Sequence, residues 1–308
     1  MSDIASDVQP RGIILGGPAA WEKRFVNALL IGAPLVGTLY ACHYFRSNAV
    51  SGIALIQFAG WYVISGVGIG IGFHRLFSHK SFQTYPAIKL LLGIAGSLAF
   101  QGSVVRWIAD QRRHHRFTDQ PPDTHTPHRF PLLARSWSRA RNLWHAHVGW
   151  MFDASTTDPR VFAPDLLRDP IAVWLDRWYF ALTALSWLLP YGVGFLVGGS
   201  EVAFQSILLG GCVRTAALHH VIWAVNSIGH TWGSRPSTRD DESRNNWVLA
   251  AFTFGEGWHN NHHAAPRSAY NNWRGYELDV NGAIIRLLER LHLVWSVNRH
   301  RKISSELP

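Results

Sequence analysis

Apolar residues fall into long blocks along this chain, with polar segments between them. Four blocks are long enough for a helix that crosses a bilayer, which takes about 20 residues, and they cover residues 25–45, 50–73, 178–197 and 202–225. A fifth block, at residues 88–105, is shorter, and we expect it to lie along the membrane interface without spanning the bilayer. The pattern predicts an all-α membrane protein with four transmembrane helices.

The composition fits a membrane environment. Hydrophobic residues make up 47% of the 308 residues and charged residues only 16%, whereas soluble proteins are about one quarter charged. A soluble bundle of buried helices is the alternative, but four apolar blocks of this length rarely coexist in a soluble chain. We treat residues 1–308 as a single domain in which 74–170 and 226–308 form a cap outside the membrane.

The basic residues predict the orientation in the membrane. The formal net charge is +9, and Lys and Arg are frequent in both terminal segments and in 74–170, whereas the connections at 46–50 and 198–201 are short and carry few charges. By the positive-inside rule, both termini and the cap lie in the cytoplasm. We expect no nucleic-acid partner, because no recognised binding motif accompanies the positive charge.

Histidine is the residue type that indicates chemistry. Eight of the 17 histidines stand in four tight groups. They are His74, His79, His114, His115, His230, His259, His262 and His263. The two cysteines, Cys42 and Cys212, fall inside apolar blocks and are expected to be free thiols, so a metal site here would be bound by imidazole, which suits iron and zinc. All four groups meet at the cytoplasmic face only if 88–105 does not cross the bilayer.

The histidine spacings are compatible with shared sites. In "HNNHH" the histidines stand at i, i+3 and i+4, which is one face of a helix, and Asn226 stands one turn before His230. His74 and His79 are five residues apart, about 140° around an ideal α-helix. We therefore expect the helix to unwind there so that both imidazoles converge.

Four motifs occur in a characteristic order: "HRLFSH" (74–79), "WIADQRRHH" (107–115), "NSIGH" (226–230) and "GEGWHNNHH" (255–263). Together with the flanking "HAHVGWMF" (145–152) and "SRP" (234–236), they make the chain resemble the integral-membrane fatty acyl desaturases, in particular the Δ9 acyl-CoA (stearoyl-CoA) desaturases, over about residues 25–293. The resemblance implies a cone of four transmembrane helices beneath a cytosolic helical cap that holds two non-haem iron ions.

The reaction implied by the resemblance is the insertion of a cis double bond, expected at Δ9, into a saturated C16–C18 acyl chain with O2 and two electrons. A di-iron hydroxylase or decarboxylase is the alternative enzyme, and a non-catalytic membrane metal binder is the alternative outside enzymes. The resemblance favours CoA as the acyl carrier, with acyl carrier protein or phospholipid as alternatives. We expect a separate electron donor, such as a ferredoxin or a cytochrome b5-like protein with its reductase.

Carried over by position, the resemblance makes the eight grouped histidines the iron ligands. Asn226 matches an asparagine that contacts iron through water. Gln111 stands where the family pattern has a histidine, and three interpretations stay open: a substitute ligand, a change of chemistry toward another oxidation, or an impaired enzyme. Gly102 and Ala109 stand where animal enzymes have polar or basic residues that contact CoA.

Further positions are predicted around the metal site. Gln101, Trp107 and Trp223 match residues that shape the acyl tunnel. Tyr62, Gly66 and Gly70 precede His74 at steps of four and are predicted to line that tunnel, although helix packing through small residues is the alternative. Asp110, Asp119 and Glu256 are candidates to accept the second N–H of ligand imidazoles, unless they are ordinary surface carboxylates. The histidines expected to have no metal role are the cap residues His125, His128, His145 and His147, and the buried, hydrogen-bonded His219 and His220 of the fourth span.

Overall fold

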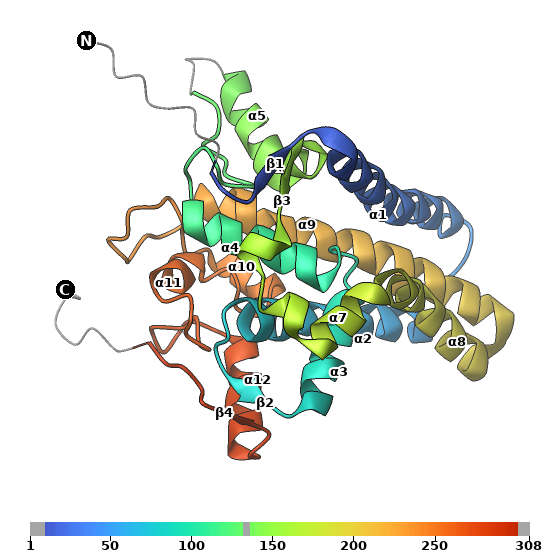
Figure 1. The fold of residues 1–308 in the computed structure, drawn as a ribbon. Helices are drawn as coiled ribbons and strands as arrows, with labels where there is room; N and C mark the ends of the chain where they lie inside the picture. The colour runs from blue at the N-terminus through green and yellow to red at the C-terminus, as the bar shows by residue number, and fades with distance from the viewer. Residues whose placement is uncertain (1–9, 132–135, 301–308) are drawn as a thin grey trace, which may run out of the picture.

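A computed structural model describes residues 10–131 and 136–300, and the chain is mostly helical (Figure 1). Three helical runs are long and apolar enough to cross a membrane: Gly17–Tyr44, Gly52–Ser78 and Tyr179–His230. The first is α1. The second joins α2 (Gly52–Val67) to the π-helix η1 (Gly68–Ser78). The third consists of α8 (Tyr179–Ser206), the π-helix η4 (Ile207–Val213), α9 (Arg214–Ser227) and the 3-10 helix η5 (Ile228–His230).

The third run folds back on itself at Gly199. This glycine has φ 76° and ψ −167°, a backbone conformation that only a residue without a Cβ adopts readily. Beyond the reversal the two arms pack closely, because a Cβ at Gly210 would lie 3.1 Å from Pro190 Cβ, and one at Gly211 would lie 3.3 Å from the Trp187 ring. The predicted apolar blocks 178–197 and 202–225 correspond to these two antiparallel arms.

The block at 88–105 forms no continuous helix. It contains most of α3 (Pro86–Ser97), a turn in which Phe100 and Gly102 have positive φ, and the first residues of α4 (Val104–Phe117). Twelve residues of α-helix extend about 18 Å, whereas the hydrocarbon core of a bilayer is about 30 Å thick. α3 alone is therefore too short to cross the core, and the position of this block at the interface stays a prediction.

The other elements are short. The helices are α5 (Ser136–His147), η2 (Gly149–Phe152), α6 (Pro159–Phe162), η3 (Leu166–Arg168), α7 (Pro170–Arg177), α10 (Trp247–Phe252), α11 (His259–Ala264) and α12 (Val280–Arg290). Strand β1 (Ile13–Leu15) pairs antiparallel with β3 (Ser155–Thr157), with Ile14 opposite Thr156. Strand β2 (Gln83–Thr84) pairs antiparallel with β4 (Val294–Trp295). These small ladders tie the cap together across long stretches of sequence.

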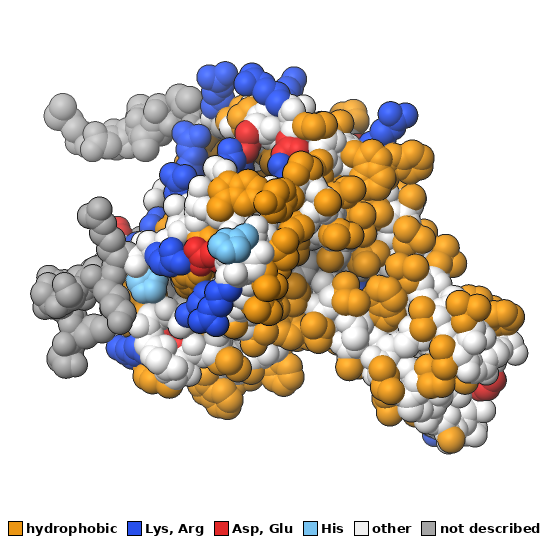
Figure 2. Space-filling model, turned by 90° about the horizontal axis from the view of Figure 1, so that it is seen from below, with side chains coloured by type: hydrophobic (Ala, Val, Ile, Leu, Met, Phe, Trp, Pro, Cys, Tyr) orange, Lys and Arg blue, Asp and Glu red, His pale blue; other side chains and the backbone are white. Residues whose placement is uncertain are grey.

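The molecule has an apolar part and a polar part. Large side chains on the long helices are exposed, such as Val36 (67%), Ile56 (72%) and Leu196 (85%). Figure 2 shows hydrophobic side chains covering the part formed by these helices, whereas most Lys and Arg side chains gather over the opposite part. An apolar surface of this extent would be unstable in water, which agrees with a protein held in a membrane.

The buried core connects the membrane part to the cap. Phe73 of η1, Ile108 of α4, Leu175 of α7 and Ile285 of α12 are all fully buried members of one hydrophobic cluster. Both η1 and α4 also carry grouped histidines. The packing of this cluster therefore fixes the helices that hold the candidate metal ligands.

Candidate metal centre

The eight grouped histidines form two sets of four. The first set is His74, His79, His115 and His262, and the second is His114, His230, His259 and His263. Within each set, one nitrogen of every ring lies within 4.8 Å of those of the other three. Neighbouring residues on a helix point about 100° apart, so α4 and α11 each supply both sets. The structure thus brings together all eight histidines singled out in the sequence.

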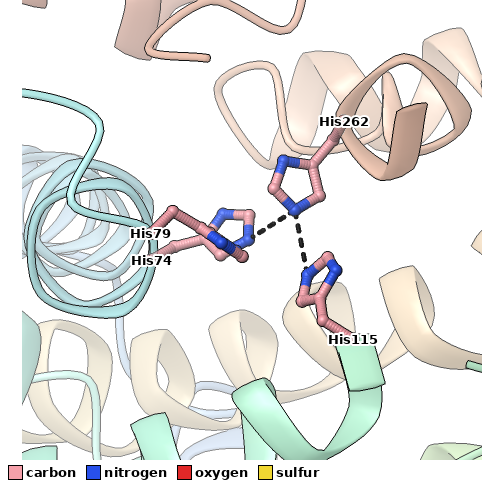
Figure 3. A group of neighbouring side chains, drawn as sticks. All are labelled: His74, His79, His115 and His262. Atoms are coloured by element: carbon pink, nitrogen blue, oxygen red, sulfur yellow. Dashed lines mark hydrogen bonds between the residues drawn. The ribbon is translucent and has the colours of Figure 1, made fainter. Parts of the chain in front are cut away.

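In the first set the Nε2 atoms point toward one another (Figure 3). Nε2 of His262 lies 3.0 Å from Nε2 of His74 and 3.1 Å from Nε2 of His115. Nε2 of His79 is buried and has no hydrogen-bond partner among the described residues. Converging imidazole nitrogens provide lone pairs for one cation, and a metal ion would satisfy all four rings.

The second set has the same arrangement. Nε2 of His259 lies 3.0 Å from Nε2 of His230 and 3.1 Å from Nε2 of His263, which in turn lies 3.3 Å from Nε2 of His114. All four side chains are at most 3% exposed. This set also lacks a cysteine or carboxylate, so its donors are those of a nitrogen-rich transition-metal site.

A π-helix explains how His74 and His79 meet. In η1 the backbone N–H of His79 donates to the carbonyl of His74, five residues earlier, which is the hydrogen bond that defines a π-helix. The two ring centroids are 4.8 Å apart. We expected the helix to unwind at this point, and that expectation is wrong: the helix widens instead, so residues five apart come to lie on one face.

Burial keeps four of the grouped imidazoles neutral. Removal from water lowers the pKa of His115, His259, His262 and His263 well below the ordinary range of histidine, and neighbouring histidines lower it further. A neutral ring retains a lone pair on one nitrogen, whereas the protonated ring has none. These four histidines are therefore in the form that can bind a metal at neutral pH.

Carboxylates orient two rings of the second set. Nδ1 of His114 donates to Asp123 at 2.9 Å, and Nδ1 of His230 donates to Asp119 at 3.0 Å. Burial alone would raise the pKa of both carboxyls, but the adjacent histidines lower it overall, so both are ionised acceptors. With the proton held on Nδ1, the lone pair of each ring is on Nε2 and faces the other histidines.

In the first set, Nδ1 of His74 donates to Glu256 at 2.5 Å. Arg75, which is almost fully buried, bridges Glu256 and Asp279 with contacts of 2.8 and 2.9 Å. Burial opposes ionisation of Glu256, yet Arg75 and His74 lower its pKa to about 2. Glu256 is therefore a fixed anion that sets the tautomer of His74.

The sequence identified some of these acids and missed others. The contacts expected for Asp119 and Glu256 are confirmed. The contact expected for Asp110 is wrong, because its carboxylate accepts a hydrogen bond from the Thr157 hydroxyl and contacts none of the eight grouped histidines. Asp123 and Asp241, whose carboxylate lies 3.5 Å from Nδ1 of His263, were missed because both stand in loops, where spacing along the chain does not predict contacts.

A cavity of about 530 Å³ adjoins the histidines. Its walls include Gln101, Trp107 and Trp223, and the Trp223 indole N–H donates to Gln101 Oε1 at 3.0 Å. Gln111 and Asn226 also line it. The cavity therefore reaches the helices that carry both sets of histidines, and all three residues matched to an acyl tunnel line it.

Gln111 lies between the cavity and the first set. It stands one turn before His115 on α4, and its amide nitrogen is 3.1 Å from Nε2 of His115. The side-chain amide has a donor end and an acceptor end, and rotation by 180° places Oε1 where the nitrogen now stands. Gln111 thus lies beside the first set, and its role as a substitute ligand stays a prediction.

Tyr62, Gly66 and Gly70 do not line this cavity. The Tyr62 hydroxyl donates to the carbonyl of Phe252, a Cβ at Gly66 would lie 2.5 Å from the Phe254 ring, and one at Gly70 would lie 2.1 Å from the Asn281 amide. These contacts are helix packing. A tunnel role for the three residues stays a prediction.

The histidines for which no metal role was expected have different surroundings. His125 contacts the second set, since it forms a buried group with His114 and Asp123, and this proximity was not expected. His128 donates from Nε2 to the carbonyl of His230 at 3.1 Å, and His145 lies against Arg129.

His219 is buried and hydrogen-bonded as expected. His220 is exposed, which corrects the expectation of burial, and it contacts His147 at 3.0 Å. Cys42 and Cys212 are both free thiols, as expected.

Comparisons with known proteins agree with this geometry. Residues 49–276 match the family model described as fatty acid desaturase. The chain is 36% identical over 265 residues to hex-5-enoyl-[acyl-carrier protein] acetylenase of Moorena producens, covering 86% of this chain and 83% of that protein. It is 33% identical to sn-2 palmitoyl-lipid 9-desaturase of Nostoc sp. over 90% of each chain. It is also 33% identical to Delta-9 acyl-lipid desaturase 1 of Arabidopsis thaliana, over 90% of this chain and 82% of that protein.

Proposed function

This chain belongs to the fatty acid desaturase family, and on that premise we propose that it inserts a cis double bond at Δ9 of a saturated C16–C18 acyl chain. Family membership makes it an oxidoreductase. The observation that carries the proposal is the pair of four-histidine sets beside a partly apolar cavity of about 530 Å³. Neither feature alone specifies the reaction, whereas together they support a metal-based oxidant acting on an acyl chain held beside it.

The donor sets fit two non-haem iron ions, one held by His74, His79, His115 and His262 and the other by His114, His230, His259 and His263. When bound, the irons supply the O2 chemistry needed to take two hydrogens from an unactivated methylene pair. Asn226, one turn before His230 and at the cavity wall, is proposed to hold a water next to the second set. Gln111 is proposed as a substitute ligand of the first set through its amide oxygen.

The chain's own residues position the substrate. Trp107, Trp223 and Gln101 form a wall that an acyl chain contacts, and the Trp223–Gln101 hydrogen bond keeps this wall rigid. Holding the reacting methylenes in the right geometry contributes a large part of such a rate, since a misplacement of about 1 Å can cost about 100-fold. The apolar side chains of the lining also limit the access of water to the reacting carbons, which suppresses side reactions.

The Δ9 position is supported by the names of the Nostoc and Arabidopsis relatives. CoA is the carrier that the family resemblance favours, and the names of relatives also include lipid and acyl-carrier-protein substrates. Gly102 lines the cavity and Ala109 is fully buried, so neither offers a polar group to a carrier. Assays with the same acyl chain on CoA, acyl carrier protein and a glycerolipid would identify the carrier.

We further propose four membrane crossings, with both termini and the histidines in the cytoplasm. The support is the reversal at Gly199, which divides a run of 52 residues into two arms, and the apolar surface of the long helices. Reduced ferredoxin or a cytochrome b5-like protein is proposed as the separate electron donor. A reporter inserted at residue 48 should be non-cytoplasmic and one at residue 237 cytoplasmic. The opposite result would overturn the orientation.

The test of function uses the purified full chain in detergent or nanodiscs with iron, O2 and a reducing donor. We expect two irons per chain and a product two mass units lighter than the acyl substrate. His114→Ala and His262→Ala should each abolish product and lower the iron content, because each removes a ligand without touching the apolar surface.

An alcohol as product would favour a hydroxylase, and iron binding without substrate loss would favour a metal binder. Alkyne formation from an alkenoyl substrate would favour the activity named for the Moorena relative.

A further inference from the structure

The turn between α3 and α4 exposes three successive carbonyl groups to the membrane arms. After α3 ends at Ser97, Phe100 adopts φ 60° and Gly102 φ 98° before α4 begins. A positive φ is unfavourable for a residue with a side chain, and such a conformation persists only where surrounding contacts fix it. The carbonyls of a helix C-terminus also lack partners within the helix and carry partial negative charge.

Arg214 supplies the first of those contacts. Its side chain is fully buried inside the apolar 52-residue run, and no described carboxylate forms an ion pair with it. Nη1 donates to the carbonyl of Leu98 at 2.9 Å, and Nη2 donates to the carbonyl and hydroxyl of Ser186 at 3.0 and 2.6 Å. The Ser186 hydroxyl donates in turn to the Leu98 carbonyl at 2.6 Å. The cation thus binds the end of α3 instead of an acid.

His219, little more than one turn further along α9, supplies the second contact. Its Nε2–H donates to the carbonyls of Ala99 and Phe100, at 3.2 and 3.0 Å. The Phe100 ring stacks on Trp187 of α8, with centroids 5.3 Å apart and planes 11° apart. Carbonyls 98, 99 and 100 are therefore all bound by buried side chains of α9, with α8 packed behind them.

This turn forms part of the cavity wall. Phe100, Gln101 and Gly102 line the cavity, the Trp223 indole N–H binds Gln101, and the backbone N–H of Gly102 donates to the Tyr179 hydroxyl at 3.1 Å. The turn also leads directly into α4, which carries His114 and His115. A shift of the turn would therefore move the wall that contacts the acyl chain relative to the histidines.

We propose that Arg214 and His219 are positioning residues that clamp the 98–100 carbonyls and thereby determine which carbons of the acyl chain lie next to the metal site, an inference that rests on the proposed function. An ionisable side chain within a membrane segment is costly and is usually kept for function. The planar guanidinium is suited to this task because its fixed fork binds several acceptors at once. The clamp acts through the turn and touches neither substrate nor metal.

The test compares four variants of the full chain in nanodiscs. His219→Leu removes the donor to two carbonyls, His219→Gln keeps an N–H in its place, and Arg214→Lys keeps the charge but loses the fork. Gln57→Leu is the matched control, because Gln57 is also buried between the membrane helices and donates to Pro190 and Ser206, yet it does not line the cavity. Each variant is assayed for iron per chain, for double-bond position by mass spectrometry, for KM and kcat, and for deuterium exchange of the amides at 99–103.

For His219→Leu and Arg214→Lys we expect unchanged iron, faster exchange at 99–103 and a product spread over neighbouring double-bond positions. kcat should fall by up to about a hundredfold, because a small misplacement of the reacting carbons can lower the rate by that factor. The change in KM should be smaller. His219→Gln should restore the native position, and Gln57→Leu should keep it. Unchanged exchange and an unchanged product position in both clamp variants would overturn the inference, as would the same product change in Gln57→Leu. If the wild-type protein makes no alkene, the proposed function fails, while the exchange measurement still reports on the clamp.

Discussion

At the residue scale, the carboxylates behind the imidazoles are expected to set how well the proposed site binds metal. Asp123 accepts from Nδ1 of His114, whereas Asp110, on the same helix as that histidine, accepts from Thr157. Loss of a carboxylate behind a ligand histidine typically lowers metal affinity about 10- to 100-fold. Asp123→Asn should therefore weaken iron binding by about that factor, measured by chelator competition on the purified protein. Asp110→Asn is the matched control and should keep wild-type affinity. Equal affinity in both variants would mean that the His114–Asp123 contact does not support the metal.

Gln111 can be tested at the same scale. If its amide oxygen is a weak ligand of the first set, Gln111→His should raise iron affinity and retain the native product, because imidazole is a stronger donor than an amide. Gln111→Leu should leave the first set with four histidines and lower the affinity of one of the two irons. The measurement is a chelator titration that resolves two binding steps. A Gln111→Leu protein with two wild-type steps would show that Gln111 is no ligand, and a change of product in Gln111→His would show that it sets the chemistry.

The grouped histidines that come together could be predicted from the sequence, whereas much of what surrounds them could not. Histidines at i and i+4 share a helix face wherever the helix lies, so the group at 259–263 was recognisable, and the adjacent pair at 114–115 was recognisable from its place in the family motif. The choice of Asp110 was wrong although it stands one turn before His114, because its carboxylate binds the Thr157 hydroxyl and Asp123 binds Nδ1 of His114 instead. Asp123 and Asp241 reach their histidines from loops, and no periodicity describes a loop.

At the element scale, the π-helix η1 depends on close contact with α3. A Cβ at Gly68 would lie 2.2 Å from the carbonyl carbon of Ala95, and one at Gly72 would lie 2.6 Å from the Leu92 oxygen. The two backbones approach so closely that only glycine fits. The sequence predicted one apolar helix here, and the widened turn could not be predicted because it arises from this packing and from the histidine geometry together.

Gly68→Ala tests this contact. The added methyl group meets backbone atoms that cannot rotate away, and overpacking of this kind typically costs about 1–3 kcal/mol. We expect a lower melting temperature and a loss of iron from the set that contains His74 and His79. Gly60→Ala, in the same helical run but with open space around its Cβ position, should change neither. If Gly68→Ala bound two irons at the wild-type melting temperature, the contact between η1 and α3 would not fix the site.

At the scale of the whole molecule, an apolar helical part and a polar cap share one site. The long helices supply His74 and His230 at their ends, and α4 and α11 supply the other members of both sets except His79. The apolar blocks and the turn at Gly199 were evident in the hydropathy pattern. The hydropathy pattern did not show that four segments far apart in the sequence meet at one site. That was inferred from the family resemblance and from the requirement that residues 88–105 not cross the bilayer.

The central claim is that two iron ions in these histidine sets convert an acyl chain into an alkene. The most direct test is one mass measurement of the product formed under ¹⁸O2 by the wild-type protein loaded with iron. The account predicts a product two mass units lighter than the substrate that contains no ¹⁸O, and none of this product from the His114→Ala protein. A product that carries ¹⁸O, or the same alkene from His114→Ala in undiminished yield, would contradict it.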